Sequence, residues 1–396
     1  MGDYFRVKHG YAFKGEYFES AGQYVLLTPG SFHEEGGYRD QGEKTKFYTG
    51  DVPEGYVLDE GDLLIAMTEQ APGLLGSSAR MPEGGRFLHN QRLGRIVDLD
   101  ERRLNKRFLY YLFNTKDVRN QISATATGGK VRHTAPERVG QVRFRLPPLG
   151  TQLRIADTLS SYDDLIENNR RRMALLEEAA RQLYREWFVR LRFPGHEHTR
   201  ITNGVPKGWE KKCLSDVASV NRESLPGSYD GEIDYIDISS VTPGSINQTT
   251  RYQFREAPSR ARKVVRHGDI IWSCVRPNRK SYAAIWQPTS NLIASTGFAV
   301  ITPTALPTAF LLQATTTDAF VGYLENHARG VAYPAVVAGD FERAQIVVPR
   351  ASLVGAFNEQ AEPLLAQGHT LRLQNEKLRA ARDLLLPRLM SGEIAV

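Results

Sequence analysis

The sequence predicts an α+β protein in which two similar domains are separated by two long helices that pair as an antiparallel coiled coil, giving a pseudo-twofold internal repeat. Two observations predict this fold class. Short motifs recur in the same order about two hundred residues apart, and each copy leads into a long helical pattern with regularly spaced apolar residues. At 396 residues and 41% hydrophobic content, the chain is long enough for such a duplicated architecture.

The repeat is anchored by four matches. GDLLIAM at 61–67 matches GDIIWSC at 268–274, at an offset of 207 residues. Three further matches follow in the same order: LGRIV from Leu93 with TGFAV from Thr296, Asp117 and Gly129 with Asp318 and Gly330, and RFRLP ending at Pro147 with QIVVP ending at Pro349. Within each copy, β-rich runs precede a short helical piece, a glycine loop and a final strand, so each is expected to be an α+β domain.

Each copy is followed by a seam of apolar residues spaced as in a coiled coil. In the first helix the spacing alternates between four and three residues, and the second helix repeats the seam less regularly. The first seam consists of Ile155, Leu159, Tyr162, Ile166, Met173, Leu176, Leu183 and Trp187, with Asn169 in a polar slot that we expect to fix register. The second consists of Phe357, Leu364, Leu371, Leu378 and Leu385. Pro363 predicts a kink or a late helix start.

These seams are expected to cover each other. Exposed rows of large apolar side chains would cost several kcal/mol, and the nearest partner of each helix is the other one. Antiparallel pairing follows because each helix is entered from its own domain. From Ile155 to Trp187 the first helix would span roughly 48 Å. The expected parts are a domain at 1–150, a long helix at 151–192, a linker at 193–207, a second domain at 208–350 and a second long helix at 351–392.

Composition limits the classes of function. A formal charge of +6 permits a polyanionic partner without demanding one. Cys213 and Cys274 are the only cysteines, so no disulfide framework is expected and a cytoplasmic location fits best. The most apolar window contains Pro303 and Pro307 and is not expected to span a membrane.

No catalytic constellation emerges from the residues. LPPLG lacks the acid or amide and the aromatic residue of a (D/N)PP(Y/F) adenine-methyltransferase motif, and GGK at 128–130 lacks the rest of a phosphate-binding loop. The HEH run at 196–198 has no third ligand at useful spacing, so no metal site is expected. We therefore expect that the chain is not an enzyme on its own and holds no cofactor.

From Leu146 to Val189 the sequence resembles the central region of the specificity (S) subunit of type I restriction-modification enzymes. GWEKKCLSDVASV from Gly208 resembles the opening of that family's second target-recognition domain, and LLLPRLMSGEI resembles its usual ending. The resemblance implies that each domain reads one half of a bipartite site in double-stranded DNA. It also implies that the helix pair sets the unread gap and docks two methyltransferase subunits, to which two restriction subunits are added in the nuclease. S-adenosylmethionine, ATP and magnesium would then be bound by the partner subunits.

DNA reading requires Arg, Lys, Asn or Gln side chains near base edges, with basic groups positioning phosphates. Two loops in each domain and a basic-aromatic cluster near Phe47 carry such residues. The candidates are Lys44, Lys46, Gln70, Arg80, Lys130, Arg132 and His133 in the first domain, and Arg276, Asn278, Arg279, Lys280, Arg329 and Tyr333 in the second. Glu69 is a further polar candidate, and Arg260, Arg262 and Lys263 form a fourth basic cluster.

Two alternatives remain open on the residues alone. The chain could be the recognition subunit of another DNA modification or defence system with the same double-domain architecture. It could instead be a coiled-coil scaffold whose domains bind protein surfaces, since mild basicity does not exclude this. Binding of random duplex DNA by the chain with a methyltransferase subunit would separate the scaffold from the DNA readers.

Overall fold

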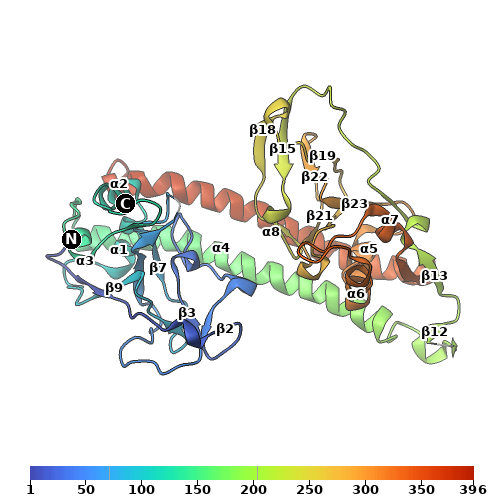
Figure 1. Cartoon of the computed structure of the whole chain (residues 1–396), viewed down its shortest axis with the longest axis horizontal. Helices are drawn as coiled ribbons and strands as arrows, with labels where there is room; N and C mark the ends of the chain where they lie inside the picture. The colour runs from blue at the N-terminus through green and yellow to red at the C-terminus, as the bar shows by residue number, and fades with distance from the viewer. Residues whose placement is uncertain (71, 203) are drawn as a thin grey trace. The chain divides into compact units, whose positions relative to one another are not determined.

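The computed structural model describes residues 1–70, 72–202 and 204–396 (Figure 1). The chain divides into two compact units. The first comprises Met1–Glu167 with Asn375–Val396, and the second comprises Asn168–Gln374. Each unit therefore contains one globular domain and a part of both long helices. Position 71, within a candidate loop, and position 203, within the expected linker, lie outside the described residues.

The first unit contains two four-stranded sheets. In the first sheet every neighbouring pair is antiparallel, and its order is β1 (Arg6–His9), β9 (Leu93–Val97), β5 (Leu63–Ala66) and β7 (Ser78–Arg80). In the second sheet β3 and β8 are parallel, and its order is β2 (Phe18–Glu19), β4 (Phe47–Tyr48), β3 (Tyr24–Leu26) and β8 (Phe87–Leu88).

The apolar run in GDLLIAM exists because β5 is covered on both faces. Leu63 and Ile65 point into a core shared with the domain's helices, whereas Leu64 and Ala66 point into the core facing the second sheet. Successive strand residues alternate between faces, so a strand buried on both sides must be apolar at every position. All four residues of β5 are completely buried.

The second unit repeats the first sheet strand for strand, whereas its second sheet shares the parallel pair but places it in the middle of the strand order. Its first sheet has the order β14 (Ala218–Val220), β23 (Phe298–Pro303), β20 (Ile270–Ser273) and β21 (Tyr282–Ala284). Its second sheet has the order β18 (Thr250–Gln253), β15 (Glu232–Ile236), β22 (Leu292–Ser295) and β19 (Ala261–Val264), and the pair β15–β22 is again parallel. The predicted internal repeat is therefore confirmed.

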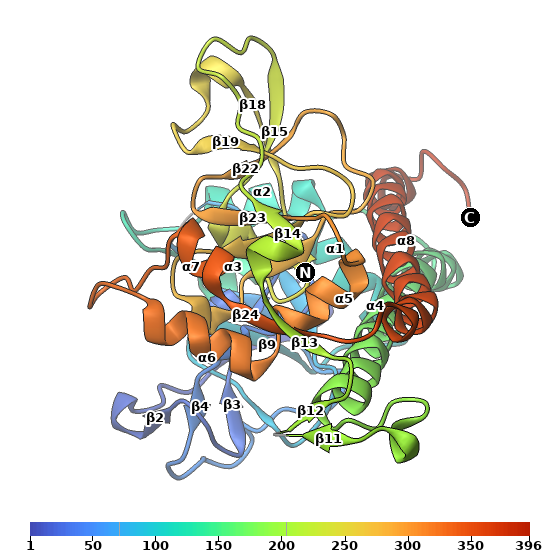
Figure 2. The ribbon, with the colours of Figure 1, turned by 90° about the vertical axis from the view of Figure 1, so that its right-hand side faces the viewer.

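Three short pairings complete the second unit. In one of them, β13 lies beside β24 (Figure 2). The pairs are β13 (Glu210–Cys213) with β24 (Gln345–Val348), β11 (Ile201–Thr202) with β12 (Val205–Pro206), and β16 (Val241–Thr242) with β17 (Ser245–Ile246).

The Gly-Asp pairs that open the repeated motifs build identical turns. Gly61 and Gly268 have φ angles of +75° and +87°, which glycine adopts without steric cost. Asp62 accepts a hydrogen bond from the backbone N–H of Asp59 at 2.8 Å, and Asp269 accepts one from Arg266 at 2.7 Å. The motif is repeated because both residues are needed to turn the chain into the central strand.

Three short helices in each unit follow the same pattern. They are α1 (Lys106–Phe113), α2 (Lys116–Ala124) and α3 (Pro136–Gly140) in the first unit, and α5 (Thr308–Ala314), α6 (Asp318–His327) and α7 (Ala338–Arg343) in the second. Thr115 and Thr317 cap α2 and α6 by accepting from the third N–H of each helix. This equivalence shifts the predicted match by one residue, because Asp318 corresponds to Lys116 and not to Asp117.

The two long helices are α4 (Leu149–Tyr184), which continues as one π-helical turn over Arg185–Val189, and α8 (Ala351–Ser391). All fourteen predicted seam residues are buried or half-buried. The late start predicted at Pro363 is wrong, since α8 begins at Ala351 and continues through this proline. Within the described residues, no helix is both long and apolar enough to cross a membrane.

The helices pack antiparallel within each unit, as the fold class predicts. In the first unit, Asp163 of α4 contacts Arg382 of α8, and the carbonyl of Ile166, one turn later, accepts from Asn375, earlier in α8. In the second unit, the rings of Trp187 and Phe357 lie 6.2 Å apart. Increasing residue number along α4 therefore goes with decreasing residue number along α8.

Candidate nucleic-acid interface

In the first unit the structure joins two candidate loops that are about sixty residues apart in sequence. Strands β6 (Thr68–Glu69) and β10 (Arg132–His133) pair antiparallel, with Glu69 opposite Arg132. Thr134 also donates its backbone N–H to the carbonyl of Met67 at 3.0 Å. The loop that contains residues 72–76 and the glycine hairpin before β10 are thus neighbours on one surface.

Glu69 is turned inward and holds the loop that follows it. Its side chain is 2% exposed. One carboxylate oxygen, Oε2, accepts from the backbone N–H groups of Gly73, Leu74 and Leu75 at 2.9–3.1 Å. The other, Oε1, pairs with Arg132 Nη1 at 3.0 Å. A buried carboxylate with four donors is fully compensated, so Glu69 is a structural anchor of the loop and does not face a partner.

Arg119 of α2 holds the same loop through its carbonyl groups. Its Nε donates to Leu75 O and its Nη1 to Glu34 O, each at 2.8 Å, and its Nη2 donates to Gly73 O. Burial lowers the pKa of Arg119, while the carboxylates of Glu69, Glu34 and Glu35 oppose this shift. Sequence reasoning missed Arg119 because its partners lie more than forty residues upstream.

A glycine hairpin has the same backbone in both units. Thr127 bridges His133 in the first unit, and Arg329 bridges Ala335 in the second. The residue after each first bridging position is a glycine, Gly128 with φ +106° and Gly330 with φ +98°. The structural partner of Gly330 is therefore Gly128, not Gly129 as the sequence match predicts.

In the second unit a different pair of side chains joins the corresponding loops. The Arg276 guanidinium lies 4.6 Å from the centre of the Tyr333 ring, and its Nη2 donates to Ala332 O at 3.1 Å. The backbone N–H of Arg276 also donates to Pro334 O at 2.7 Å. Lys280, at the end of this loop, pairs with Asp318 of α6 at 3.0 Å and thereby lowers the pKa of that carboxyl.

Arg276 occupies the position that Glu69 occupies in the first unit. Arg276 directly follows Val275, which pairs with Ala335 of the hairpin, and the backbone of Arg276 bonds to Pro334. In the same way, Glu69 directly follows Thr68, which pairs with His133, and Glu69 lies opposite Arg132. One unit therefore fastens its two loops with an ion pair, and the other with a cation–π contact. The two units share the backbone arrangement of these loops, while the side chains that the loops present differ.

The remaining candidates fall into three classes of position. Several are exposed at the two joined loops: Gln70, Lys130, His133, Asn278, Arg279, Arg329 and Tyr333. Arg80 is exposed at the end of β7. Others lie at the second sheet of their unit: Lys44 and Lys46 before β4, and Arg260, Arg262 and Lys263 at or before β19. The structure does not bring these two basic clusters into the joined loops.

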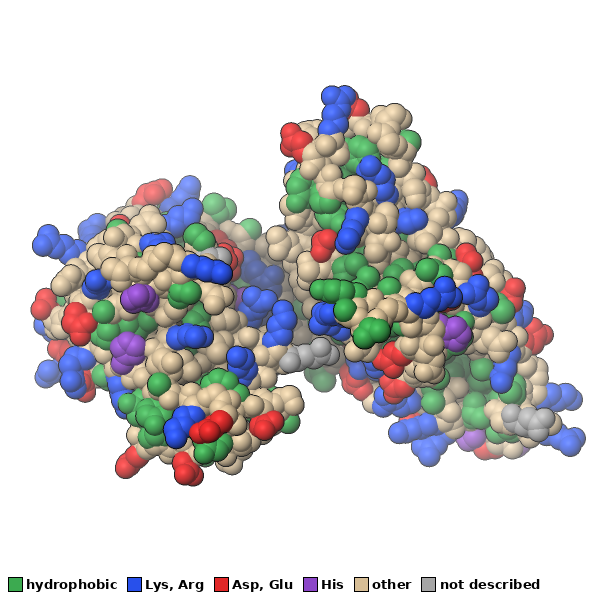
Figure 3. Space-filling view, viewed as in Figure 1, with side chains coloured by type: hydrophobic (Ala, Val, Ile, Leu, Met, Phe, Trp, Pro, Cys, Tyr) green, Lys and Arg blue, Asp and Glu red, His purple; other side chains and the backbone are tan. Residues whose placement is uncertain are grey.

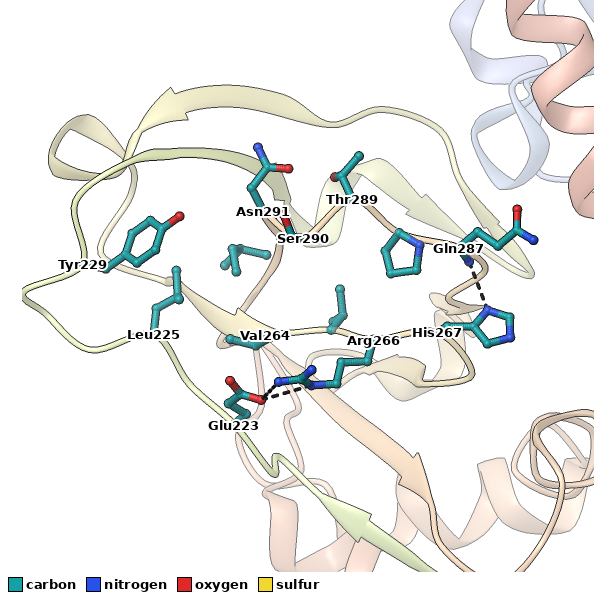
Figure 4. A pocket seen from close by; sticks show the side chains of 13 residues that line it. Glu223, Leu225, Tyr229, Val264, Arg266, His267, Gln287, Thr289, Ser290 and Asn291 are labelled. Carbon is teal, nitrogen blue, oxygen red and sulfur yellow. Dashed lines mark hydrogen bonds and ion pairs between the residues drawn. The ribbon is translucent and has the colours of Figure 1, made fainter.

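A cleft of about 700 Å³ opens in the second unit beside β19 and β22 (Figure 4). Its lining is largely apolar, with Leu225 and Val264 among the residues that form it. Arg266 at its edge pairs with Glu223 at 2.6 Å. His267 Nδ1 accepts from the backbone N–H of Gln287 at 3.1 Å. The charged groups at this edge therefore neutralise each other.

Charges of both signs are interspersed over the visible faces of both units (Figure 3). In the part of the chain that the structure describes, no group of three His, Cys, Asp or Glu side chains is placed to hold a metal ion. His196, in the HEH run, uses Nδ1 in a 2.8 Å hydrogen bond with the carbonyl of Phe193.

Comparison with known proteins identifies relatives of one kind. Residues 1–178 match the family model described as the type I restriction modification DNA specificity domain. The chain is 24% identical to the type I restriction enzyme MjaIX specificity subunit of Methanocaldococcus jannaschii, over 84% of this chain and 78% of that protein. It is 21% identical to the HindI specificity subunit of Haemophilus influenzae, over 72% and 76%.

Among solved structures, the fold is similar to that of the type I restriction-modification S subunit from M. genitalium. The TM-score is 0.58 at 15% sequence identity, and the alignment covers 98% of this chain and 94% of that one.

Proposed function

We propose, from the membership of this chain in the family of type I restriction-modification specificity subunits, that each of its two domains reads one half of a bipartite site in double-stranded DNA. The observation that supports this most directly is the pair of joined loops in each unit. Each pair places exposed Arg, Lys, Asn or Gln side chains side by side, which are the groups that pair with base edges and phosphates.

The two half-sites would differ in sequence. The first unit presents Gln70 on the loop after β6 and Lys130 on its hairpin, whereas the second presents Asn278 and Arg279 on the loop after Val275 and Arg329 and Tyr333 on its hairpin. Glutamine and asparagine suit adenine, arginine suits guanine, and lysine suits guanine or a phosphate. Two domains with the same backbone and different reading side chains fit a target without palindromic symmetry.

The helix pair would set the number of unread base pairs between the half-sites and dock the partner subunits. A length near 48 Å corresponds to roughly fourteen base pairs at 3.4 Å each, as an upper guide. Large apolar side chains remain exposed along both helices, notably Leu165, Leu175 and Leu384. Exposed leucines on a long helix suit a protein partner, and we propose two methyltransferase subunits there.

Methylation and cleavage of DNA would be carried out by the partner subunits. These 396 residues carry no (D/N)PP(Y/F) motif and no phosphate-binding loop. S-adenosylmethionine would be bound by the methyltransferase subunits, and ATP and magnesium by restriction subunits where these join the complex. The chain itself would select where the adenine is methylated or the DNA is cut.

Methylation-sensitive sequencing of DNA from cells that express this chain with its methyltransferase subunit tests the proposal. We expect methylated adenines within one recurring motif made of two different halves and a fixed gap. Cells that express the methyltransferase subunit alone are the control and should lack this motif. A motif without two halves, or methylation that does not depend on this chain, would refute the proposal.

A further inference from the structure

We infer that Glu69 and Arg119 are positioning residues that determine what the first unit reads, because together they fix the backbone of the loop at residues 73–75. This inference rests on the proposed function and adds residues to it. Neither side chain faces outward: the Glu69 side chain is buried, and the Arg119 guanidinium is occupied by three carbonyl groups. Their influence on DNA would pass entirely through the loop.

The two residues bind opposite kinds of backbone group in the same short segment. Glu69 accepts hydrogen bonds from the N–H groups of residues 73–75, and Arg119 donates hydrogen bonds to the carbonyl groups of Gly73 and Leu75. A loop whose donors and acceptors are both held from within is preorganised, so little conformational entropy is lost when it meets a partner. Gly73 and Gly76 have φ angles of +119° and +80°, conformations that such external bonds keep in place.

Arg132 positions the loop together with Glu69 and Arg119, and we do not assign it a direct contact with DNA. Its Nη1 pairs with Glu69 at 3.0 Å, and its Nη2 donates to the backbone and hydroxyl oxygens of Ser123 at 2.6 and 3.0 Å. The charge of Arg132 is therefore compensated by a buried carboxylate. The neighbouring Lys130 is exposed at the hairpin tip and remains the group for phosphate or base contact.

The test uses the complex of the full chain with its methyltransferase subunits and two DNA libraries, each with one half-site fixed and the other randomised. Glu69→Ala and Arg119→Met should lower the preference for the correct first half-site roughly tenfold per read base pair. The preference for the second half-site should stay at the wild-type value, which gives an internal control in the same molecule. Glu69→Gln keeps an oxygen for the loop N–H groups and should recover much of the preference.

Gln121→Ala is the matched control on the same helix, since Gln121 bonds to Arg143 and not to the loop. A purely structural role would lower total methylation and leave the ratio of correct to incorrect half-sites unchanged. That outcome for Glu69→Ala and Arg119→Met would overturn the inference. For Arg132→Met we expect relaxed preference with an unchanged salt dependence of binding, and a slope reduced by about one would show a phosphate contact instead.

Failure of the proposed function itself would look different. In that case the wild-type complex would methylate the two libraries without regard to the randomised half-site. With a wild-type preference established, the outcome for the variants decides the role of Glu69 and Arg119 alone.

Discussion

Arg382 of α8 donates to Asp163 of α4 at 2.5 Å, and this ion pair is largely shielded from solvent. The other oxygen of Asp163 accepts the hydroxyl of Tyr111 from α1 at 2.6 Å. Burial and the charge of Asp163 raise the pKa of Tyr111, so the hydroxyl stays protonated and keeps donating. One carboxylate thereby joins both long helices and the first domain within the first unit.

Arg382→Met is expected to destabilise the first unit by about 2 kcal/mol. The substitution removes one partner of a shielded pair and leaves a carboxylate without its cation. Urea unfolding of the purified chain measures the loss. Arg388→Met on the same helix is the control, since its pair with Glu393 is exposed and 3.6 Å long, and it should cost under about 0.5 kcal/mol. Equal losses from the two variants would contradict the assignment.

Replacing Arg276, Arg279 and Lys280 together by alanine should abolish sequence-selective methylation by the assembled complex. The change removes the cation that fastens the two loops of the second unit, the exposed Arg279, and Lys280, which pairs with Asp318. A variant with the same charge loss elsewhere in the unit, Lys211, Arg251 and Arg255 to alanine, should retain selectivity. Methylation of the native site at the normal rate by the loop variant would refute the placement of the reading surface.

Lys130→Ala should weaken DNA binding and reduce its salt dependence. An exposed lysine that neutralises one phosphate releases counterions, so its loss lowers the slope of log K against log salt by about 0.9. Filter binding of the complex between low and moderate salt measures this slope. Arg102→Ala, which removes an exposed charge beside Asp100, serves as the comparison and should not alter the slope. An unchanged slope for Lys130→Ala would argue against its contact.

The buried histidine His89 predicts a loss of stability in mild acid. Burial lowers the pKa of His89 to about 4, from an ordinary value near 6.5. Between these values the unfolded chain binds the proton more readily, so stability falls as the pH falls from about 6.5 to about 4, by about 3 kcal/mol in total. Nε2 of the neutral ring meets the carbonyl of Leu93 at 3.0 Å.

Unfolding midpoints across this pH range check the histidine prediction. His89→Gln keeps an amide donor for the Leu93 carbonyl and should remove most of the pH dependence. His198→Gln, at an exposed position, should leave the wild-type pH profile. If His89→Gln and wild type lose stability in parallel, another group is responsible.

Much of the fold could be predicted because it depends on periodic patterns. The run LLIA predicts a strand, and the heptad spacing from Ile155 predicts a long paired helix, since burial dictates both patterns. The one-residue errors at Asp117 and Gly129 arose because a shift of one residue also aligns an aspartate with Asp318 and a glycine with Gly330. With Gly128 and Gly129 adjacent, only the backbone angle decides which one turns the chain.

The interior of the candidate site could not be predicted. Sequence treats Glu69, Gln70 and Arg132 as equivalent polar groups on loops. Whether such a group turns outward depends on its partners, and the donors that hold Glu69 come from the loop backbone and from β10. Arg119 gave no signal, because a lone arginine on a short amphipathic helix resembles a solvated surface charge.

If the hairpins read DNA as proposed, their shared backbone has a consequence for the acquisition of new targets. Backbone bonds between Thr127 and His133, and between Arg329 and Ala335, close it in both units, and Gly128 or Gly330 supplies the turn. Exposed residues at the tip, such as Lys130, take no part in these backbone bonds. Under the proposed function, a substitution at an exposed tip residue such as Lys130 would change the preferred base while the strands beneath stay folded, so a descendant would gain a new target without an unstable intermediate.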